Sequence, residues 1–535
     1  MRMEHMPEKR LILVIAAEQA YIRRTSPHDV FSAPNDILFS AVTDTYIPLV
    51  DMMYRLEDEN VPFKLNLVMS PLLCELLEDP SVQNQYIANL EKRIEIGKKE
   101  LERNESDPKV LALVKSTLET LKKKKDLFEN RFQKRIVKQI RKFVAKGEVE
   151  IIPTAASYAY LPHYADMPES INAQIEAGLY SAKYFFGEIG GGFYLPYMGW
   201  ASGFDRIMRP YGINYTILDA KALLFSETPN GRGIFCPVRT NGSLVLFGTD
   251  PDTISDIAGD DGYMNDESYL SVESDVGFEL PGEELKDIME NDGSRVQTGF
   301  KYWKRHEETE ERTAYDPKEA RRKASDDARD FFESKKAKLI AASRELPEDD
   351  AVLVCNIPAE YIGQEWHEGP LWLEEVIRRC ASDGDIELSV CKDNLKKQFS
   401  LQKLEPYPCS CGGNGYSEDL LDSCNSWMMR YTRKATERMI ELANRFPGET
   451  SLKARLLNLG AKEVFLVQSS ALPKMVQEGL CPDFAREEFK DDILSFSQVF
   501  DALASNSVST EWLTRLEKEH PLFPWMNYRI FSRKK

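Results

Sequence analysis

A short segment at residues 192–200 carries the first side chain whose position suggests chemistry. It reads G-F-Y-L-P-Y-M-G-W, and residues 193–195 have the composition of a β-strand. Because proline cannot donate to a sheet ladder, Pro196 predicts the end of this strand and the start of a loop. In a β/α barrel, loops at the carboxyl ends of strands carry the catalytic side chains. Tyr197 stands at this position and is our first candidate.

Two glutamates form a second candidate group. Glu18 directly follows the apolar run at residues 11–17, and Glu365 lies in the loop after a second apolar run at residues 351–355. Continuous apolar runs of this kind are typical of buried parallel strands, so we expect both carboxyl groups to face one cleft. Two neighbouring carboxyl groups could act as general acid and base. They could equally be hydrated walls of the cleft, and the residues alone leave both alternatives open.

The motifs around these residues resemble those of glycoside hydrolase family 57, in its 1,4-α-glucan branching-enzyme branch. The family pattern that matches residues 192–200 is roughly G-F-W-L-P-E-x-x-Y, in which the Glu is the catalytic nucleophile. That position is Tyr197 here. The family pattern Y-D-x-E-x-x-G-H-W-W-x-E-G matches the segment after residue 355, and its catalytic Asp falls on Pro358. The resemblance therefore implies that both catalytic carboxylate positions are substituted.

The same resemblance implies a set of sugar-binding positions, many of them also changed. Family histidines are replaced by Ala16, Glu18, Tyr158 and Gln364, and family tryptophans by Tyr194, Glu365, Cys411 and Leu472. Flanking residues hold the register, so misalignment does not explain these changes. The residues we expect to line a substrate site are Glu18, Tyr21, Tyr158, Trp200, Asp219, Gln364, Glu365 and Trp366.

Three functions are compatible with this pattern. Retaining glycosidases need two carboxyl groups about 5–5.5 Å apart, and a proline at residue 358 can supply neither an acid nor a base. The first prediction is therefore a non-catalytic relative that binds an α-glucan or another oligosaccharide, or regulates a partner enzyme. The second is an active α-glucan transferase or hydrolase with a rebuilt site, using Glu18 with Glu365, or Tyr197 as a nucleophile as in sialidases. The third is a scaffold without sugar affinity.

The expected fold is α/β, with a distorted (β/α)7 barrel, a helical insertion and an all-α C-terminal domain. We expect the barrel to span residues 1–390 and the helical domain to span residues 391–535. A charged helical pattern, broken near residue 104, predicts a helical hairpin insertion at about residues 83–146. Residues 250–295 are acidic and irregular in composition, so we expect a long excursion from the barrel there.

Composition limits the partners and the location. A chain of 535 residues suggests two or three domains, and its formal net charge of -18 argues against binding nucleic acid. The sequence has no run of about 18 apolar residues, so we expect no membrane span. Its 9 cysteines have no framework spacing, which favours a reducing cytoplasm. Cys409 and Cys411 alone are a poor zinc signature, and we expect neither a metal nor a cofactor.

Overall fold

A parallel sheet forms the centre of the fold. The computed structural model describes residues 7–285, 295–305, 312–395, 400–418 and 420–534. Strand β1 is central because it pairs with β2, β7 and β8, all in parallel orientation. Its apolar residues are buried on both faces, as parallel strands covered by helices require. The strands of this sheet are β3 (Val149–Ile151), β2 (Leu65–Met69), β1 (Lys9–Ala17), β7 (Ala351–Pro358) and β8 (Glu387–Leu388).

A second, smaller sheet faces the first across a buried apolar cluster. It contains β4 (Tyr215–Leu218) parallel to β6 (Val245–Gly248), with β5 (Val238–Arg239) antiparallel to β6. Isolated parallel bridges join the two sheets, linking Thr154 to Tyr194, Gly192 to Tyr215, and Thr249 to Val354. Side chains from both sheets, such as Val14 of β1 and Phe247 of β6, pack in the same cluster.

The strand predicted at residues 193–195 is reduced to a single bridge at Tyr194. Glycines precede this segment and Pro196 follows it, so few of its backbone groups can enter a ladder. The prediction of a full strand was therefore wrong in extent. The bridge still sets Tyr197 three residues beyond the sheet.

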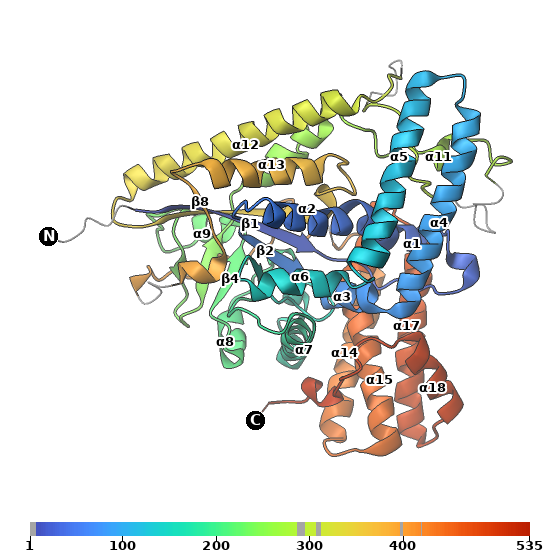
Figure 1. The fold of residues 1–535 in the computed structure, drawn as a ribbon. Coiled ribbons are helices and arrows are strands. Elements are labelled where there is room, and N and C mark those ends of the chain that lie inside the picture. Colours follow the sequence, from blue (N-terminus) through green and yellow to red (C-terminus); the bar gives the residue numbers. More distant parts are fainter. Residues whose placement is uncertain (1–6, 286–294, 306–311, 396–399, 419, 535) are drawn as a thin grey trace.

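Helices cover the sheets on the outside (Figure 1). In this view α12 and α13 run side by side above the strands, while α6 and α7 lie below them. The longer helices around the sheets are α1 (Ala33–Ala41), α2 (Ile47–Asp58), α3 (Pro71–Glu78), α6 (Ile136–Ala145), α7 (Pro168–Phe186), α12 (Pro317–Glu345) and α13 (Gly369–Ser382). The shorter ones are α8 (Phe204–Met208), α9 (Ala220–Leu224), α10 (Thr253–Ala258) and α11 (Val276–Glu279).

Two long helices, α4 (Pro80–Arg103) and α5 (Pro108–Asp126), form an antiparallel hairpin that extends beyond the sheets (Figure 1). Both begin with the same device, an aspartate followed by proline. The carboxylates of Asp79 and Asp107 accept hydrogen bonds from the first free backbone N–H groups, and proline at the first helical position loses no hydrogen bond.

The segment between the sheets and the C-terminal helices is irregular. The sequence predicts helix from about residue 391, but the described residues between 400 and 425 form turns and loops. Gly412, Gly413 and Gly415 adopt positive φ angles there, which favours turns over helix. This connection returns to the body of the fold, because the Trp200 N–H donates to the Cys409 carbonyl at 2.8 Å.

The C-terminal region is a helical bundle, drawn in orange and red in Figure 1. Its helices are α14 (Ser426–Arg445), α15 (Ser451–Gln468), α16 (Ala471–Glu478), α17 (Pro482–Ser505) and α18 (Thr510–Glu519). Helix α15 packs against both α14 and α17, which makes it the centre of the bundle. In the described part of the chain, no helix combines the length and apolar character needed to cross a membrane.

The acidic excursion contains more structure than its composition predicts. Between residues 250 and 285 it forms α10 and α11, while residues 286–294 lie outside the described part of the chain. Asp250 of this segment accepts hydrogen bonds from Lys335 and Lys338 of α12, at 2.6 Å each. These ion pairs tie the start of the excursion to the body of the fold.

Candidate functional site

The candidate site lies at the carboxyl edge of the central sheet. The register of β1 and β7 places Ala16 directly opposite Pro358. Glu18 and Glu360 each follow two residues later, so both leave the sheet at the same edge. Tyr197 packs against the apolar cluster that contains Ala16, which brings the two positions of the expected catalytic pair to one region.

The backbone at Tyr197 is held in an uncommon conformation. Tyr197 and Met198 both have positive φ angles, of 56° and 51°, and nearby Tyr158 has a φ of 52°. This left-handed region costs a residue with a Cβ roughly 1–2 kcal/mol. A hydrogen bond from the Cys411 N–H to the Tyr197 carbonyl, at 2.8 Å, helps to maintain it. Strained residues of this kind cluster at ligand sites and active sites.

Tyrosine rings fill the space around Tyr197. Its ring centroid lies 5.4 Å from that of Tyr158 and 6.5 Å from that of Tyr160, both in edge-on geometry. Tyr158 in turn lies 6.5 Å from Tyr194 in a stacked arrangement. The Tyr197 hydroxyl is buried beside Glu18, but no described residue lies in suitable geometry to share a hydrogen bond with it. The tyrosines therefore pack mainly against one another.

A lysine from the C-terminal bundle enters this edge of the sheet. Lys474 of α16 lies 4.0 Å from the Glu360 carboxylate and 3.6 Å from that of Glu478. Burial lowers the pKa of Lys474, but Glu360, Glu478 and Glu18 together raise it above its ordinary value. Lys474 is therefore charged at neutral pH and offsets part of the negative charge at the site.

Glu18 is the side chain best suited to exchange a proton. Its pKa is raised to about 7, first by burial and further by Glu360 and Glu478, while Lys474 and the neighbouring Tyr197 hydroxyl lower it. A carboxyl group with this pKa is present in both protonation states near neutral pH. Such a group fits a general acid or base.

Glu365 is an exposed residue, as Glu478 is, whereas Glu18 and Glu360 are partly buried. Partial burial and Glu360 raise its pKa to about 7, with Lys474 lowering it. Because the residue as a whole is exposed, water screens these interactions. Glu18 and Glu365 thus share the neighbours Glu360 and Lys474, as expected for side chains that face one cleft.

The pKa of Tyr197 argues against a nucleophilic phenolate. Burial raises it well above the ordinary value, and the charge of Glu18 raises it further. A nucleophilic side chain is normally activated by a lowered pKa or by an adjacent base. Glu18, whose pKa the Tyr197 hydroxyl lowers, is the candidate base beside that hydroxyl.

Four other expected site residues have structural partners away from the tyrosine cluster. Trp200 is 2% exposed and packs in a different apolar cluster, against Phe204. Trp366 is 1% exposed and packs against Trp372. The two polar residues are Asp219, which accepts from the Lys221 N–H at the start of α9, and Gln364, which donates to the Ile37 carbonyl and to Ser40.

Tyr21 also lies outside this cluster. It is buried, and burial raises the pKa of its phenol. Its ring borders a hollow lined mainly by α17 and α18 of the C-terminal bundle. The structure therefore assigns Tyr21 to a different part of the molecule from Tyr197 and Glu18.

Sequence reasoning missed Lys474 and Glu478. A signal was present, because Lys474 directly follows the Ser470–Pro473 segment, which aligns with a family motif and has Leu472 at the position of its tryptophan. The packing of α16 brings this motif to the sheet, where the Ser470 hydroxyl accepts a hydrogen bond from the Tyr160 N–H at 2.9 Å.

Two family models match the chain. Residues 12–269 match the model described as Glycosyl hydrolase family 57, and residues 431–531 match the model described as 1,4-alpha-glucan branching enzyme, C-terminal. Among curated proteins, the 1,4-alpha-glucan branching enzyme TK1436 of Thermococcus kodakarensis is 23% identical over 523 residues, which cover 93% of this chain and 74% of that protein. The probable 1,4-alpha-glucan branching enzyme Rv3031 of Mycobacterium tuberculosis is 22% identical over 481 residues, covering 86% of each chain.

Solved structures extend the similarity to the whole chain. The α-amylase AmyC from Thermotoga maritima matches with a TM-score of 0.90 and 26% identity, covering 99% of this chain and 100% of that chain. The structure of TK1436 in complex with glucose shares the fold, with a TM-score of 0.86 at 20% identity and coverage of 98% and 97%. Parts of this chain thus match the models of glycosyl hydrolase family 57 and of the branching-enzyme C-terminal region, and nearly the whole chain shares its fold with these solved structures.

Proposed function

We propose that this chain binds a neutral α-glucan at the edge around Tyr197 and Lys474 without cleaving it. The observation that carries this proposal is the pair of residues at the expected catalytic positions, Tyr197 and Pro358. The buried phenol has a raised pKa, and proline offers no acid or base. The relatives' names, α-glucan branching enzyme and α-amylase, supply the substrate class.

The charges around the site favour a neutral sugar over an acidic one. Glu18, Glu360 and Glu478 surround a single lysine, Lys474, so the local charge is negative. Sugar hydroxyls can donate hydrogen bonds to these carboxylates and accept one from the ammonium group. An added carboxylate on the sugar would instead meet like charges.

The proposal includes a distorted (β/α)7 barrel over residues 1–390 with a helical domain after it. The isolated bridges at Tyr194, Tyr215 and Thr249 support this reading, because they continue the parallel order between the two sheets. In such a barrel the tyrosine cluster and Lys474 would lie at the catalytic face.

An active enzyme with a rebuilt site is the second candidate, and one observation favours it. Glu18 has a pKa of about 7 and lies beside the Tyr197 hydroxyl, which is the arrangement a general acid or base would need. Its difficulty is the second carboxyl group, because Glu360 and Glu478 pair with Lys474, and Glu365, the partner that the sequence predicts, is exposed to water.

Calorimetry and an activity assay on the full chain separate these functions. We expect maltoheptaose to bind, a uronic-acid oligosaccharide not to bind, and amylose to show neither hydrolysis nor branching. Lys474→Gln should weaken maltoheptaose binding about tenfold, because it removes a charged hydrogen-bond donor worth roughly 1.5 kcal/mol. The control Lys490→Gln, at an exposed position of α17, should bind as the parent chain does.

Two results would overturn the proposal. Turnover of amylose that disappears in Glu18→Gln or Tyr197→Phe would establish the rebuilt active site. If maltoheptaose does not bind at all, the result would favour a scaffold function, in which the tyrosine cluster only stabilises the fold.

A further inference from the structure

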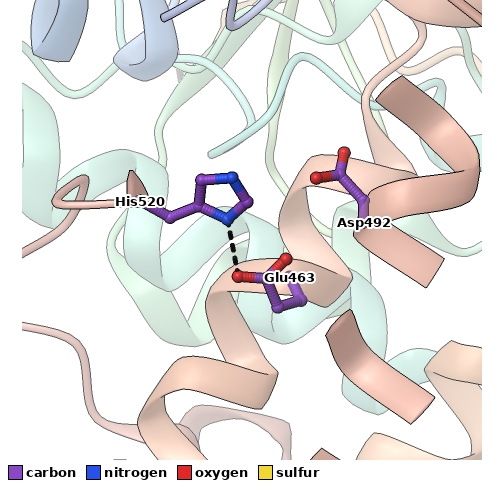
Figure 2. Close-up of side chains that lie close together, drawn as sticks. All are labelled: Glu463, Asp492 and His520. Carbon is purple, nitrogen blue, oxygen red and sulfur yellow. Dashed lines mark hydrogen bonds and ion pairs between the residues drawn. The ribbon is translucent and has the colours of Figure 1, made fainter. Parts of the chain in front are cut away.

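A second polar centre lies inside the C-terminal bundle, apart from the tyrosine cluster. It consists of Glu463 on α15, Asp492 on α17 and His520, the residue directly after α18. Figure 2 shows the three side chains converging from separate parts of the bundle. One candidate ligand atom from each residue lies within 4.8 Å of the other two.

Glu463 provides the strongest sign that a partner is missing from this centre. Its residue is fully buried, and its Oε1 pairs with His520 Nδ1 at 2.7 Å. Its other oxygen, Oε2, is buried and has no hydrogen-bond partner among the described residues. Figure 2 shows the Glu463 carboxylate between the His520 ring and Asp492. Leaving a buried carboxylate oxygen unpaired is costly unless another group satisfies it.

The same centre also contains several ionisable groups whose pKa values are displaced. Asp492 is buried, and burial together with Glu463 raises its pKa well above the ordinary value. Burial lowers the pKa of His520, but Glu463 raises it to about 9. Glu488, which lies on α17 as Asp492 does, adds a further carboxyl group nearby. The centre thus brings three carboxyl groups to one imidazole, and burial favours the protonated, neutral form of Asp492.

We propose that Glu463, Asp492 and His520 form a binding site for a divalent transition-metal ion of the zinc class. One imidazole nitrogen and two carboxylate oxygens are ligands that suit Zn²⁺, and three protein ligands leave a position for water. The metal would take the place of the proton between His520 Nδ1 and Glu463 and of the proton that Asp492 carries, and both protons would pass to solvent. An imidazole ligand disfavours Mg²⁺ and Ca²⁺, which prefer oxygen.

The geometry requires only a small closing movement. Ligand atoms around a tetrahedral zinc ion lie about 3.4 Å apart, given zinc–ligand distances of about 2.1 Å. The separations, all within 4.8 Å, would therefore shrink by roughly 1.5 Å at most, while the 2.7 Å between His520 Nδ1 and Glu463 Oε1 would open by roughly 0.7 Å. Asp492 and His520 also border a hollow of about 430 Å³, together with Tyr21 and Glu488, which gives an ion a route to the site.

Such a site would join three helices of the bundle. Glu463, Asp492 and His520 come from α15, α17 and the end of α18, so a bound ion would cross-link elements far apart in the chain. A ligand that binds the folded state alone stabilises it in proportion to its free concentration. The inference is independent of the proposed sugar site, because none of its three residues takes part in the tyrosine cluster.

The experiment uses the full chain after treatment with a chelator. Calorimetric titration with ZnCl₂ should give one site per chain, and added Zn²⁺ should raise the melting temperature. Co²⁺ bound in its place should give visible absorption typical of nitrogen and oxygen ligands. Less than one equivalent of Zn²⁺ bound by the parent chain, or a thiolate-to-cobalt band from cysteine, would overturn the proposal.

Matched variants locate the site. Glu463→Gln and His520→Gln should each weaken Zn²⁺ binding more than tenfold, since each removes one ligand of three. Asp491→Asn, an exposed neighbour of Asp492 on α17, should bind as the parent chain does. Circular dichroism without metal checks that each variant folds. Unchanged Zn²⁺ affinity in a folded Glu463→Gln chain would also overturn the proposal.

Discussion

This molecule has two centres rich in carboxyl groups, and a different kind of cation offsets the negative charge in each. At the sheet edge, Glu18, Glu360 and Glu478 surround Lys474, a cation that keeps its charge and shares it among partly exposed partners. In the bundle, Glu463 and Asp492 are buried and their cation is His520, which can lose its proton. A lysine must lose its proton before it can bind a metal, and the surrounding carboxylates oppose that loss. A histidine loses its proton more readily and can then act as a metal ligand.

The comparison teaches that the same residue types need not imply the same function. Exposure at the sheet edge lets water and sugar hydroxyls compete for the carboxylates, which suits a neutral polyhydroxyl ligand. Burial in the bundle excludes such a ligand and leaves room for an ion. Removing the cation from each centre tests this difference directly.

The largest effect should come from His520→Leu. Without the imidazolium, the buried carboxylate of Glu463 would lose its ionic partner, and breaking a buried ion pair costs about 3–5 kcal/mol. We expect urea denaturation at pH 7 with chelator present to show a loss of about 3 kcal/mol. The control His28→Leu, at an exposed position, should change the free energy of unfolding by less than about 0.5 kcal/mol. Equal effects from both variants would show that His520 has no special electrostatic role.

Lys474→Met should have a smaller effect, of about 1 kcal/mol. The side chains of Lys474 and Glu360 are 32% and 31% exposed, so water compensates the carboxylates that the variant leaves unpaired. Because Lys474 lowers the pKa of Glu18, its removal should also move that pKa above about 7. Denaturation at pH 7 and nuclear magnetic resonance titration of Glu18 would measure both changes. If Lys474→Met lowered the free energy of unfolding as much as His520→Leu does, the proposed difference between the two centres would be wrong.

The sequence was sufficient to predict the elements whose signals are local. Apolar runs predicted β1 and β7. Glu18 and Tyr197 each follow a strand-like segment, which predicted that both side chains lie at the sheet edge. Asp316 is followed by proline, the same local signal as at the starts of α4 and α5, and its carboxylate accepts from the Lys318 N–H at the start of α12.

Features set by packing could not be predicted in this way. Lys474 reaches the sheet edge only because α16 packs there, and the Glu463–Asp492–His520 centre joins residues without any sequence spacing typical of metal sites. Trp200 carries no local sign that its ring would pack beside Phe204, away from the tyrosine cluster. Side-chain direction after a left-handed turn depends on the backbone at Tyr197 and Met198, which sequence does not reveal.

Glu18 should make stability depend on pH in a direction unusual for a carboxyl group. Its pKa of about 7 lies above the unfolded value of about 4.3, so the folded state holds a proton that the unfolded state releases. Stability from this group is therefore fully present below about pH 4 and is lost as pH rises towards 7. With an allowance for partial exposure, the loss should be about 1–2 kcal/mol.

Glu18→Gln isolates this contribution, because glutamine keeps the shape and cannot ionise. The variant should match the parent chain at pH 4 and exceed its free energy of unfolding by about 1 kcal/mol at pH 8. Asp491→Asn, on the exposed surface of α17, serves as the control and should leave the pH profile unchanged. A parent chain whose stability does not fall between pH 5 and 8 relative to Glu18→Gln would show that Glu18 ionises normally.

The smallest effect concerns the Tyr197 hydroxyl. This group is buried beside Glu18 and lowers the pKa of that carboxyl group, but its geometry falls short of a full hydrogen bond, so Tyr197→Phe removes a weakly paired polar atom and keeps the ring that packs against Tyr158. We expect denaturation to show a change of less than about 0.5 kcal/mol, or a slight gain in stability. Tyr158→Phe is a matched control in the same cluster. A loss of more than about 1 kcal/mol that vanishes in the Glu18→Gln background would reveal direct coupling between the two side chains. Such coupling would mean that Glu18, like the buried carboxylate in the bundle, depends on one specific partner. It would favour the rebuilt active site over binding alone.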